Sequence, residues 1–276
     1  MNILITGSNG FIGKNLSQKL KKKYEIYYLK RSKFYSRKKN KIKCDLLKKN
    51  HINLLMKEKL KLDIIIHAAS KLASSSNLEN ISLIKNNILI YENLSLVINK
   101  FNPKQVINLS SIAIYPNKDG VYDETSQVRP SINNDCLYGL SKFIGENILD
   151  FKCSKSNILN LRIAQVYGSG MRSDRIYEIM KKQLKDKNTI NVYGMGRRVS
   201  GFIHIDSLVS KIKFCIKKKL DGIFNIGDEN LSYKQLAKKI IIKYGNINSQ
   251  IKFLDKGVNS KTFINFKKLK RMEKKN

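Results

Sequence analysis

A tyrosine and a lysine stand four positions apart in the segment YGLSK, as Tyr138 and Lys142. We predict that this segment is helical, which places both side chains on one face with their Cβ atoms about 5–6 Å apart. A phenol has a pKa of about 10 and is a poor base at neutral pH, but a neighbouring positive charge favours the phenolate. The pair therefore indicates proton transfer to and from a hydroxyl group, and the alternative is an ordinary pair on a helix surface.

Three glycines at three-residue spacing follow a short apolar run in MNILITGSNGFIG. The run Ile3–Ile5 suits a buried strand, and the apolar residues from Phe11 onward have helical spacing. Gly7, Gly10 and Gly13 thus lie at a strand-to-helix turn. There glycine permits a positive φ and a close approach by a ligand, and the free N–H groups of the helix attract phosphate. This setting indicates a dinucleotide-binding turn, although glycines can also serve the turn alone.

Polar side chains stand at three further places where a predicted strand or loop ends. Ser110 and Ser111 close the strand in VINLSS, where a hydroxyl can meet a ligand or cap the next turn. His67 follows the apolar run of DIIIHAAS, and it can line a site or be a structural histidine of the core. Asp45 in CDLL follows a basic loop and can contact an adenine edge or cap a turn.

Apolar, strand-like runs alternate with amphipathic, helix-like segments over the first part of the chain. The strand-like runs are YEIYYLKRS, LDIIIHAAS, KQVINLSS and NILNLRIAQVYG, and the helical segments include SLIKNNILIYENLSLVINKF and YGLSKFIGENILDF. This alternation predicts an α/β fold with a doubly wound parallel Rossmann sheet, which binds ligands at the carboxyl edge of its strands. We assign residues 1–166 to this dinucleotide-binding domain.

The pattern changes beyond Gly168. SDRIYEIMKKQLKD and YKQLAKKIIIKY predict helices, and GFIHI and GIFNIGD predict short strands. We expect residues 167–276 to form a smaller α+β substrate-binding part, with segments near 203–228 returning to the sheet. The final segment, FKKLKRMEKKN, is expected to be a frayed, solvated end.

The composition limits the class of protein. The 276 residues, 42% of them hydrophobic, suffice for a full core. We find no apolar run of membrane-spanning length and no leader-like start, so we expect a cytoplasmic protein without a membrane partner. The cysteines, at positions 44, 136, 153 and 215, form no C-x-x-C pair, which argues against disulfides and against a metal site.

The formal net charge of +33 comes mainly from lysines spread along the whole chain. A nucleic-acid surface would instead concentrate cations and aromatic residues in one stripe. We therefore interpret the charge as a generally basic surface, with no specific nucleic-acid partner. Non-specific affinity for polyanions at low salt is still expected.

The motifs TGSNGFIG, CDL, DIIIHAAS, the spaced Asn87 and Asn93, SSIAIY, YGLSK, RIAQVYGSGMR and FIHIDS resemble, in this order, the extended short-chain dehydrogenase/reductase family. These are NAD(P)-dependent nucleotide-sugar epimerases, dehydratases and ketoreductases, and the resemblance covers roughly residues 1–228. It implies that Tyr138 exchanges a proton with a sugar hydroxyl. Lys142 would lower the pKa of Tyr138 and hold the nicotinamide ribose, and Ser111 would hydrogen-bond the reacting oxygen.

The resemblance also implies a cofactor site made of Gly7, Asn9, Gly10, Phe11, Ile12, Gly13, Arg31, Asp45, Leu46, His67, Ala68, Ala69, Asn87, Tyr138 and Lys142. Arg31 belongs to YYLKRSK, at the end of the second strand, where NAD-specific folds carry an acidic residue. A guanidinium there can grip a 2′-phosphate, so we expect NADP in preference to NAD.

Departures from the family pattern bear on the substrate. The dehydratase branch carries an acidic pair just after the catalytic hydroxyl, whereas Ile112 and Ala113 follow Ser111, which argues against 4,6-dehydration. Many relatives carry an arginine for the substrate's diphosphate where Ser200 stands. We expect substrate contacts from Ser110, Ser111, Arg172, Arg197 and Arg198.

The favoured function is a nucleotide-sugar epimerase that uses hydride transfer and a Ser-Tyr-Lys proton relay. An NADP-dependent 4-keto-sugar nucleotide reductase is the alternative, and a non-catalytic dinucleotide-binding regulator comes third. The complete Ser, Tyr and Lys set favours an enzyme, because a sensor needs no proton relay. In relatives the helices that correspond to residues 82–100 and 138–152 form a four-helix interface, so we expect a homodimer.

Overall fold

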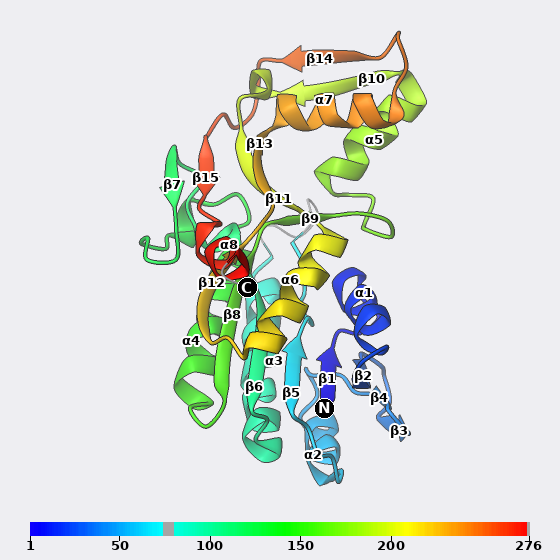
Figure 1. Cartoon of the computed structure of the whole chain (residues 1–276), viewed down its shortest axis with the longest axis vertical. Coiled ribbons are helices and arrows are strands. Elements are labelled where there is room, and N and C mark those ends of the chain that lie inside the picture. Colours follow the sequence, from blue (N-terminus) through cyan, green and yellow to red (C-terminus); the bar gives the residue numbers. More distant parts are fainter. Residues whose placement is uncertain (74–79, 275–276) are drawn as a thin grey trace.

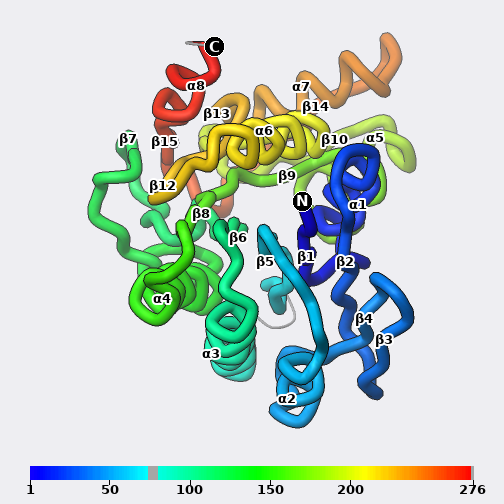
Figure 2. The backbone as a smooth tube through the Cα atoms, turned by 60° about the horizontal axis from the view of Figure 1, so that its bottom comes forward, coloured from blue at the N-terminus to red at the C-terminus, as the bar shows by residue number. Residues whose placement is uncertain are grey.

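An eight-stranded sheet with helices on both faces forms the larger part of the molecule, as Figures 1 and 2 show. The computed structural model describes residues 1–73 and 80–274. The strands of this sheet are β1 (Asn2–Thr6), β2 (Glu25–Lys30), β3 (Ser36–Lys38), β4 (Lys41–Lys43), β5 (Ile64–His67), β6 (Gln105–Ser111), β8 (Asn157–Ile163) and β12 (Gly222–Ile226). Its helices are α1 (Phe11–Leu20), α2 (Lys49–Lys57), α3 (Ser82–Phe101), α4 (Cys136–Lys152) and α6 (Ile205–Lys218).

The side chains of each central strand alternate between two buried cores. Ile3 and Ile5 pack on the side of α1 and α6, whereas Leu4 packs on the side of α2, α3 and α4. This period of two explains why the strands are almost continuously apolar, since both faces of the sheet are covered. The predicted doubly wound α/β fold is confirmed.

The strand order is β12-β8-β6-β5-β1-β2-β4-β3, with every neighbouring pair parallel except β3 and β4. The chain runs outward from β1 to β2 and later resumes on the other side of β1 with β5. The connections therefore diverge between β1 and β5, and in open α/β sheets a ligand crevice opens at the carboxyl ends of such strands. The turn after β1 and His67 at the end of β5 both lie there.

The smaller part lies beyond this carboxyl edge (Figure 1). It contains a three-stranded sheet in the order β13-β11-β9 and two two-stranded sheets, β10 with β14 and β15 with β7. Its elements are β7 (Gly120–Tyr122), β9 (Gln165–Tyr167), α5 (Ile176–Lys187), β10 (Thr189–Tyr193), β11 (Val199–His204), β13 (Glu229–Ser232), α7 (Tyr233–Tyr244), β14 (Gln250–Leu254) and β15 (Thr262–Ile264). Short 3₁₀ turns are η1 (Ile112–Ile114), η2 (Pro130–Ile132) and η3 (Gly194–Gly196). Of the segments near 203–228, β12 joins the main sheet and β11 the smaller one.

The prediction of a frayed end is wrong. Residues Lys267–Lys274 form helix α8, and Phe266 and Leu269 are buried. The ring of Phe266 fills the space that a side chain at Gly201 or Gly227 would need. Two buried apolar residues among many lysines are a weak sequence signal, and only the neighbouring glycines show that a pocket exists for them.

No helix within residues 1–73 and 80–274 is both long enough and apolar enough to span a bilayer. All four cysteines carry free thiols, and burial raises the pKa of Cys44 and Cys215 to about 12 and that of Cys153 to about 11. These buried thiols are therefore protonated at neutral pH and pack as small apolar groups.

Candidate active site

The glycine turn after β1 presents the start of α1 to the crevice. Gly7 has a φ of +64°, and its carbonyl accepts a 2.9 Å hydrogen bond from the Gly10 amide. A Cβ at Gly13 would lie 2.2 Å from that carbonyl oxygen, so the close packing of helix on strand requires glycine. Gly10, the N-cap residue, provides no side-chain bond, and the first turn holds no acidic residue. The exposed helix start therefore fits a pyrophosphate group.

The end of β5 forms the next wall of the crevice. His67 Nδ1 lies 2.8 Å from Thr6 Oγ1, which also accepts a bond from the Ala69 amide. His67 Nε2 is buried and has no hydrogen-bond partner among the described residues. Burial and the charge of Lys142 hold the pKa of His67 well below its usual value, so its imidazole is neutral. A buried nitrogen that lacks a partner is suited to a bound group.

Asn87 on α3 fastens the loop that follows β5. Its side chain accepts a bond from the Lys71 amide (2.8 Å) and donates to the Lys71 carbonyl (3.0 Å). It also donates to the hydroxyl of Ser141 on α4 (3.0 Å). The Asn87 side chain thus ties the loop that follows His67 to helices α3 and α4.

Asp45 and Arg31 lie near the outer strands. Asp45 accepts a 3.1 Å bond from the Leu47 amide and so caps a turn, which was one of the two alternatives for this residue. The neighbouring Leu46 carbonyl accepts a 2.6 Å bond from Asn93. Arg31 is exposed just beyond β2, where no carboxylate stands beside it in the sequence.

Tyr138 and Lys142 lie on α4, one turn apart, with Lys142 Nζ 5.7 Å from the centre of the Tyr138 ring. Lys142 is only 2% exposed. Its ammonium donates to the Leu109 carbonyl (2.8 Å) and to the Tyr91 hydroxyl (3.3 Å). Burial lowers the pKa of Lys142 to about 8, although the nearby Glu146 carboxylate acts in the opposite direction.

Ser111 stands where β6 enters η1. Its hydroxyl accepts a 3.1 Å bond from the Ala113 amide. A Cβ on Gly139 would lie only 2.2 Å from the Ala113 carbonyl oxygen, so only a glycine lets α4 approach η1 this closely. Because Gly139 follows Tyr138 directly, this contact joins the serine turn to the start of the tyrosine helix.

Ser110 does not join Ser111, contrary to the substrate contact that we assigned to it. Its side chain is buried and donates to Glu146. Glu146 also forms a 2.9 Å ion pair with Arg162, and both side chains are almost fully buried. The physical reason is the strand period, since neighbouring residues of β6 point to opposite faces.

Arg175 is a residue of the site that sequence reasoning missed. Burial raises the pKa of Tyr138 to about 12 and Asp135 acts in the same direction, while Arg175 and a hydrogen bond from Ser70 oppose the rise. Arg175 also donates a 2.8 Å bond to the Ala73 carbonyl, across the crevice from α5. It is the N-cap residue of α5, where a cation is unfavourable to the helix dipole. An arginine at the predicted start of a helix was therefore the one feature of the sequence that could have indicated a role for Arg175.

The arginines predicted for the substrate have separate neighbours. Arg172 pairs with Asp174, and Arg197 is exposed. The Arg198 guanidinium lies 5.2 Å from the centre of the Tyr233 ring, and its Nε is buried without a partner among the described residues. Ser200 accepts a 2.9 Å bond from Gln165.

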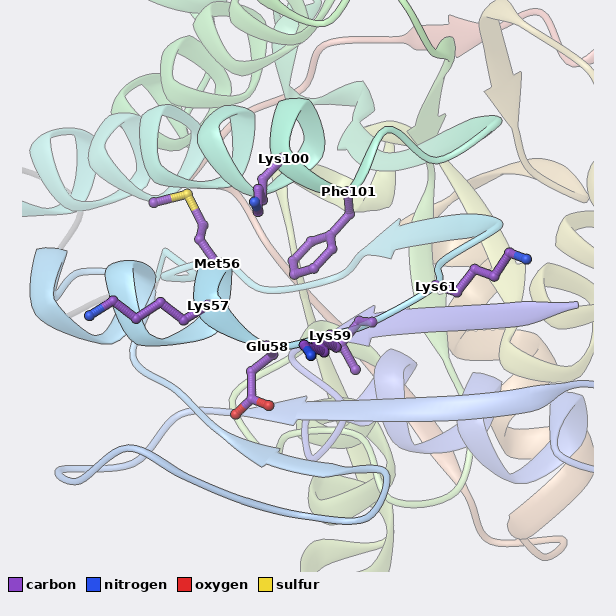
Figure 3. Close-up of a pocket in the computed structure, with 8 residues that line it drawn as sticks. Met56, Lys57, Glu58, Lys59, Lys61, Lys100 and Phe101 are labelled. Atoms are coloured by element: carbon purple, nitrogen blue, oxygen red, sulfur yellow. The ribbon is translucent and has the colours of Figure 1, made fainter.

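A pocket with a volume of about 700 Å³ lies far from this chemistry. It is open and is lined by Met56, Lys57, Glu58, Lys59, Leu60, Lys61, Lys100 and Phe101, which Figure 3 shows at the ends of α2 and α3. These residues precede β5 and β6, so they lie at the amino edge of the sheet. Lys57 and Lys100 complement the carboxyl ends of their helices, which explains their charge. In residues 1–73 and 80–274, no cluster of His, Cys, Asp and Glu side chains suits a metal ion.

Known proteins are similar to this chain in sequence and in fold. A dTDP-D-glucose 4,6-dehydratase of Dictyostelium discoideum is 27% identical over 266 residues, which cover 87% of this chain but only 61% of the relative. The crystal structure of UDP-glucuronic acid 4-epimerase from Bacillus cereus, in complex with UDP-glucuronic acid and NAD, superposes with a TM-score of 0.82 at 21% identity, over 100% of this chain and 94% of that one.

A second structure has the same fold. The dTDP-glucose 4,6-dehydratase DesIV from Streptomyces venezuelae, with NAD and TYD bound, has a TM-score of 0.80 at 20% identity and covers 98% of this chain and 90% of its own. The sequence profile of the NAD dependent epimerase/dehydratase family matches residues 3–227. With the glycine turn, the Tyr138 and Lys142 pair and the doubly wound sheet in place, this match shows that the chain belongs to the NAD dependent epimerase/dehydratase family of enzymes.

Proposed function

We propose that this protein is an NAD(P)-dependent nucleotide-sugar epimerase in which Ser111, Tyr138 and Lys142 form the proton relay. The observation that carries the proposal is the convergence of these residues with the glycine turn at one edge of the sheet. Tyr138 and Lys142 share a face of α4, and the Gly139 contact holds α4 against the turn that Ser111 caps.

The residues divide the work by their chemistry. Ser111 donates a hydrogen bond to the reacting sugar oxygen, and Tyr138 takes the proton of the sugar hydroxyl and later returns it. Lys142 holds ribose hydroxyls and supplies positive charge beside the phenol. The turn around Gly10 and the neutral His67 hold the remainder of the dinucleotide. When bound, the nicotinamide supplies hydride transfer.

The residues after Ser111 separate epimerisation from dehydration. Ile112 and Ala113 form the turn η1, and neither can act as an acid or a base. The acidic pair that the dehydratase branch carries at these positions would be needed to remove water from the sugar. We therefore favour the epimerase over the dehydratase, although a dehydratase is among the relatives.

A panel of UDP, dTDP and GDP sugars and their 4-keto forms, each incubated with NAD or NADP, tests the proposal. Nuclear magnetic resonance of the products should show interconversion of two epimers with no net change in reduced cofactor. Stoichiometric consumption of reduced cofactor by a 4-keto sugar would identify the reductase instead. Dinucleotide binding without turnover of any sugar would contradict both and leave the regulator.

A further inference from the structure

Lys142 belongs to a line of buried polar side chains that crosses the larger part of the molecule. Its ammonium donates to the Tyr91 hydroxyl at 3.3 Å, and that hydroxyl donates to Asn108 Oδ1 at 3.0 Å. Asn108 Nδ2 donates to Asn160 Oδ1 at 2.8 Å. Asn160 Nδ2 donates to both oxygens of the exposed Asp150, at 3.0 and 3.3 Å. These hydrogen bonds connect helix α3, strands β6 and β8, and the end of α4.

The two ends of this line determine the direction of every bond in it. An ammonium is only a donor and an ionised carboxylate only an acceptor, whereas a phenol and a carboxamide can be both. The amide nitrogen of Asn160 must therefore face Asp150, which leaves the Asn160 oxygen to accept from Asn108. The Asn108 oxygen in turn accepts from the Tyr91 hydroxyl. Tyr91 must then present its oxygen lone pairs to Lys142. The assignment follows from chemistry and not from the choice of amide orientation.

Strand pairing and a glycine make room for this line of buried polar side chains. Asn108 and Asn160 are direct cross-strand partners, so their side chains meet on the α3 and α4 side of the sheet. A Cβ at Gly145 would lie 2.2 Å from the ring of Tyr91, so glycine there makes room for the phenol. Tyr91, Asn108 and Asn160 are each at most 1% exposed. Burying such groups costs free energy that an apolar core would avoid, which indicates a use for them.

We propose that Tyr91 is a positioning residue for Lys142, held in one orientation by the hydrogen bonds that end at Asp150, and that it sets where the ammonium points beside Tyr138. An ammonium has three N–H groups. The Leu109 carbonyl and the Tyr91 hydroxyl accept two of them, which leaves the third to face the crevice. Aligned hydrogen bonds strengthen one another, so the negative end at Asp150 adds to the hold on the cation. The line does not conduct protons, because the two carboxamides do not titrate.

The proposal rests on the assignment of Lys142 under the proposed function, but its test does not need turnover. Three other titratable groups act directly on Lys142 or lie beside it: Tyr138 and Glu146 on α4, and His67 on β5. Two more act through these, Arg162 on β8 through Glu146 and Arg175 through Tyr138. Substitutions at Tyr91 and Asp150 leave all of these in place.

The experiment is nuclear magnetic resonance of protein labelled with ¹³C at the lysine ε carbon, titrated over pH. The Lys142 signal is assigned by its loss in Lys142→Met. Removing an acceptor from a charged group disfavours the charge, so Tyr91→Phe should lower the pKa of Lys142 by about one. Asp150→Asn, an exposed change with little effect on packing, should lower it by a smaller amount.

Two control variants are matched to these changes. Tyr35→Phe, just before β3, removes another phenol hydroxyl, which donates a 2.7 Å bond to Glu58 and is not part of this line, and should leave the Lys142 titration unchanged. Asp186→Asn removes an equal surface charge on α5. If Tyr91→Phe lowers only the free energy of unfolding and the titration stays in place, Tyr91 is structural and the proposal fails. If the titration moves but no sugar is turned over, the positioning stands and the proposed function fails.

Discussion

The ammonium nitrogen of Lys142 lies 5.7 Å from the centre of the Tyr138 ring, one turn further along α4. Both are positioned from outside their helix: Tyr91 and Leu109 hold the lysine side chain, and the backbone next to Tyr138 packs against Ala113 at Gly139. Their relative position is therefore set by tertiary packing as well as by helical geometry.

Tyr138→Phe should reduce turnover by ~10²–10⁴-fold and leave dinucleotide affinity nearly unchanged. The substitution keeps the ring and removes only the oxygen that carries the proton. Steady-state kinetics on the sugar identified in the panel, with calorimetric titration of the cofactor, measures both quantities. Turnover equal to that of the wild type would remove Tyr138 from the proton relay.

Gly10→Ala should weaken dinucleotide binding while leaving the fold nearly as stable. Gly10 has an ordinary extended backbone, and a Cβ there would approach only the Gly7 carbonyl oxygen, at 3.3 Å. The protein itself therefore tolerates a side chain at this position, whereas a bound dinucleotide would collide with it. Gly13→Ala is the contrast, because its Cβ clashes with the backbone, and it should cost ~1–3 kcal/mol of stability. Thermal unfolding and dinucleotide titration of both variants separate the two effects. Equal affinities for Gly10→Ala and wild type would make the glycine turn merely structural.

Arg31→Ala should weaken the binding of NADP by ~1–3 kcal/mol and leave that of NAD nearly unchanged. The reason is that the exposed guanidinium after β2 has no acidic neighbour in the sequence and can pair with a 2′-phosphate. Calorimetric titration of both dinucleotides into both proteins decides the matter. The family is described as NAD dependent. Equal affinities of the wild type for NADP and NAD, or equal losses of the two affinities in the variant, would show that Arg31 does not bind the 2′-phosphate.

Arg175→Met should move the titration of Tyr138 to higher pH. The charge of Arg175 lowers the pKa of the phenol, so removing it makes the phenolate harder to form. The midpoint of the pH profile of kcat/KM for sugar oxidation should therefore rise, whereas Arg175→Lys should restore most of the wild-type profile. Arg37→Met, which breaks an ion pair with Glu58 and a bond to the Lys39 carbonyl near β3, provides the control. An unshifted midpoint in Arg175→Met would show that this charge does not act on the phenol.

A homodimer through α3 and α4 is expected at micromolar concentration. The outer face of α4 forms an apolar groove lined by Phe143, Ile144, Asn147, Ile148, Phe151 and Lys152, and Phe151 is 90% exposed. A contiguous exposed apolar surface, unlike a single exposed apolar residue, is typical of an interaction site. Light scattering should report a dimer that Phe151→Glu dissociates, whereas Phe34→Glu, at another exposed phenylalanine, leaves it intact. A monomeric wild type would overturn this expectation.

The periodicity of the sequence sufficed for the main architecture. SLIKNNILIYENLSLVINKF is helix α3 from its first residue to its last, and the apolar runs around Ile65 and Ile107 are central strands. Such segments are long or uniformly apolar, so local preference and burial agree. The short strands β3, β4, β7 and β15 were not predicted, because three residues carry too little pattern.

The candidate site divides in the same way. The glycine spacing and the four-residue step from Tyr138 to Lys142 are local features, and the sequence by itself determined them. Only the tertiary structure decided that Ser110 turns to Glu146, that Arg175 reaches Tyr138 from α5, and that Tyr91 meets Lys142 across 51 positions of sequence. Each of these contacts joins elements far apart in the chain, where no local spacing exists to be read, and the sheet order and helix packing alone bring the partners together.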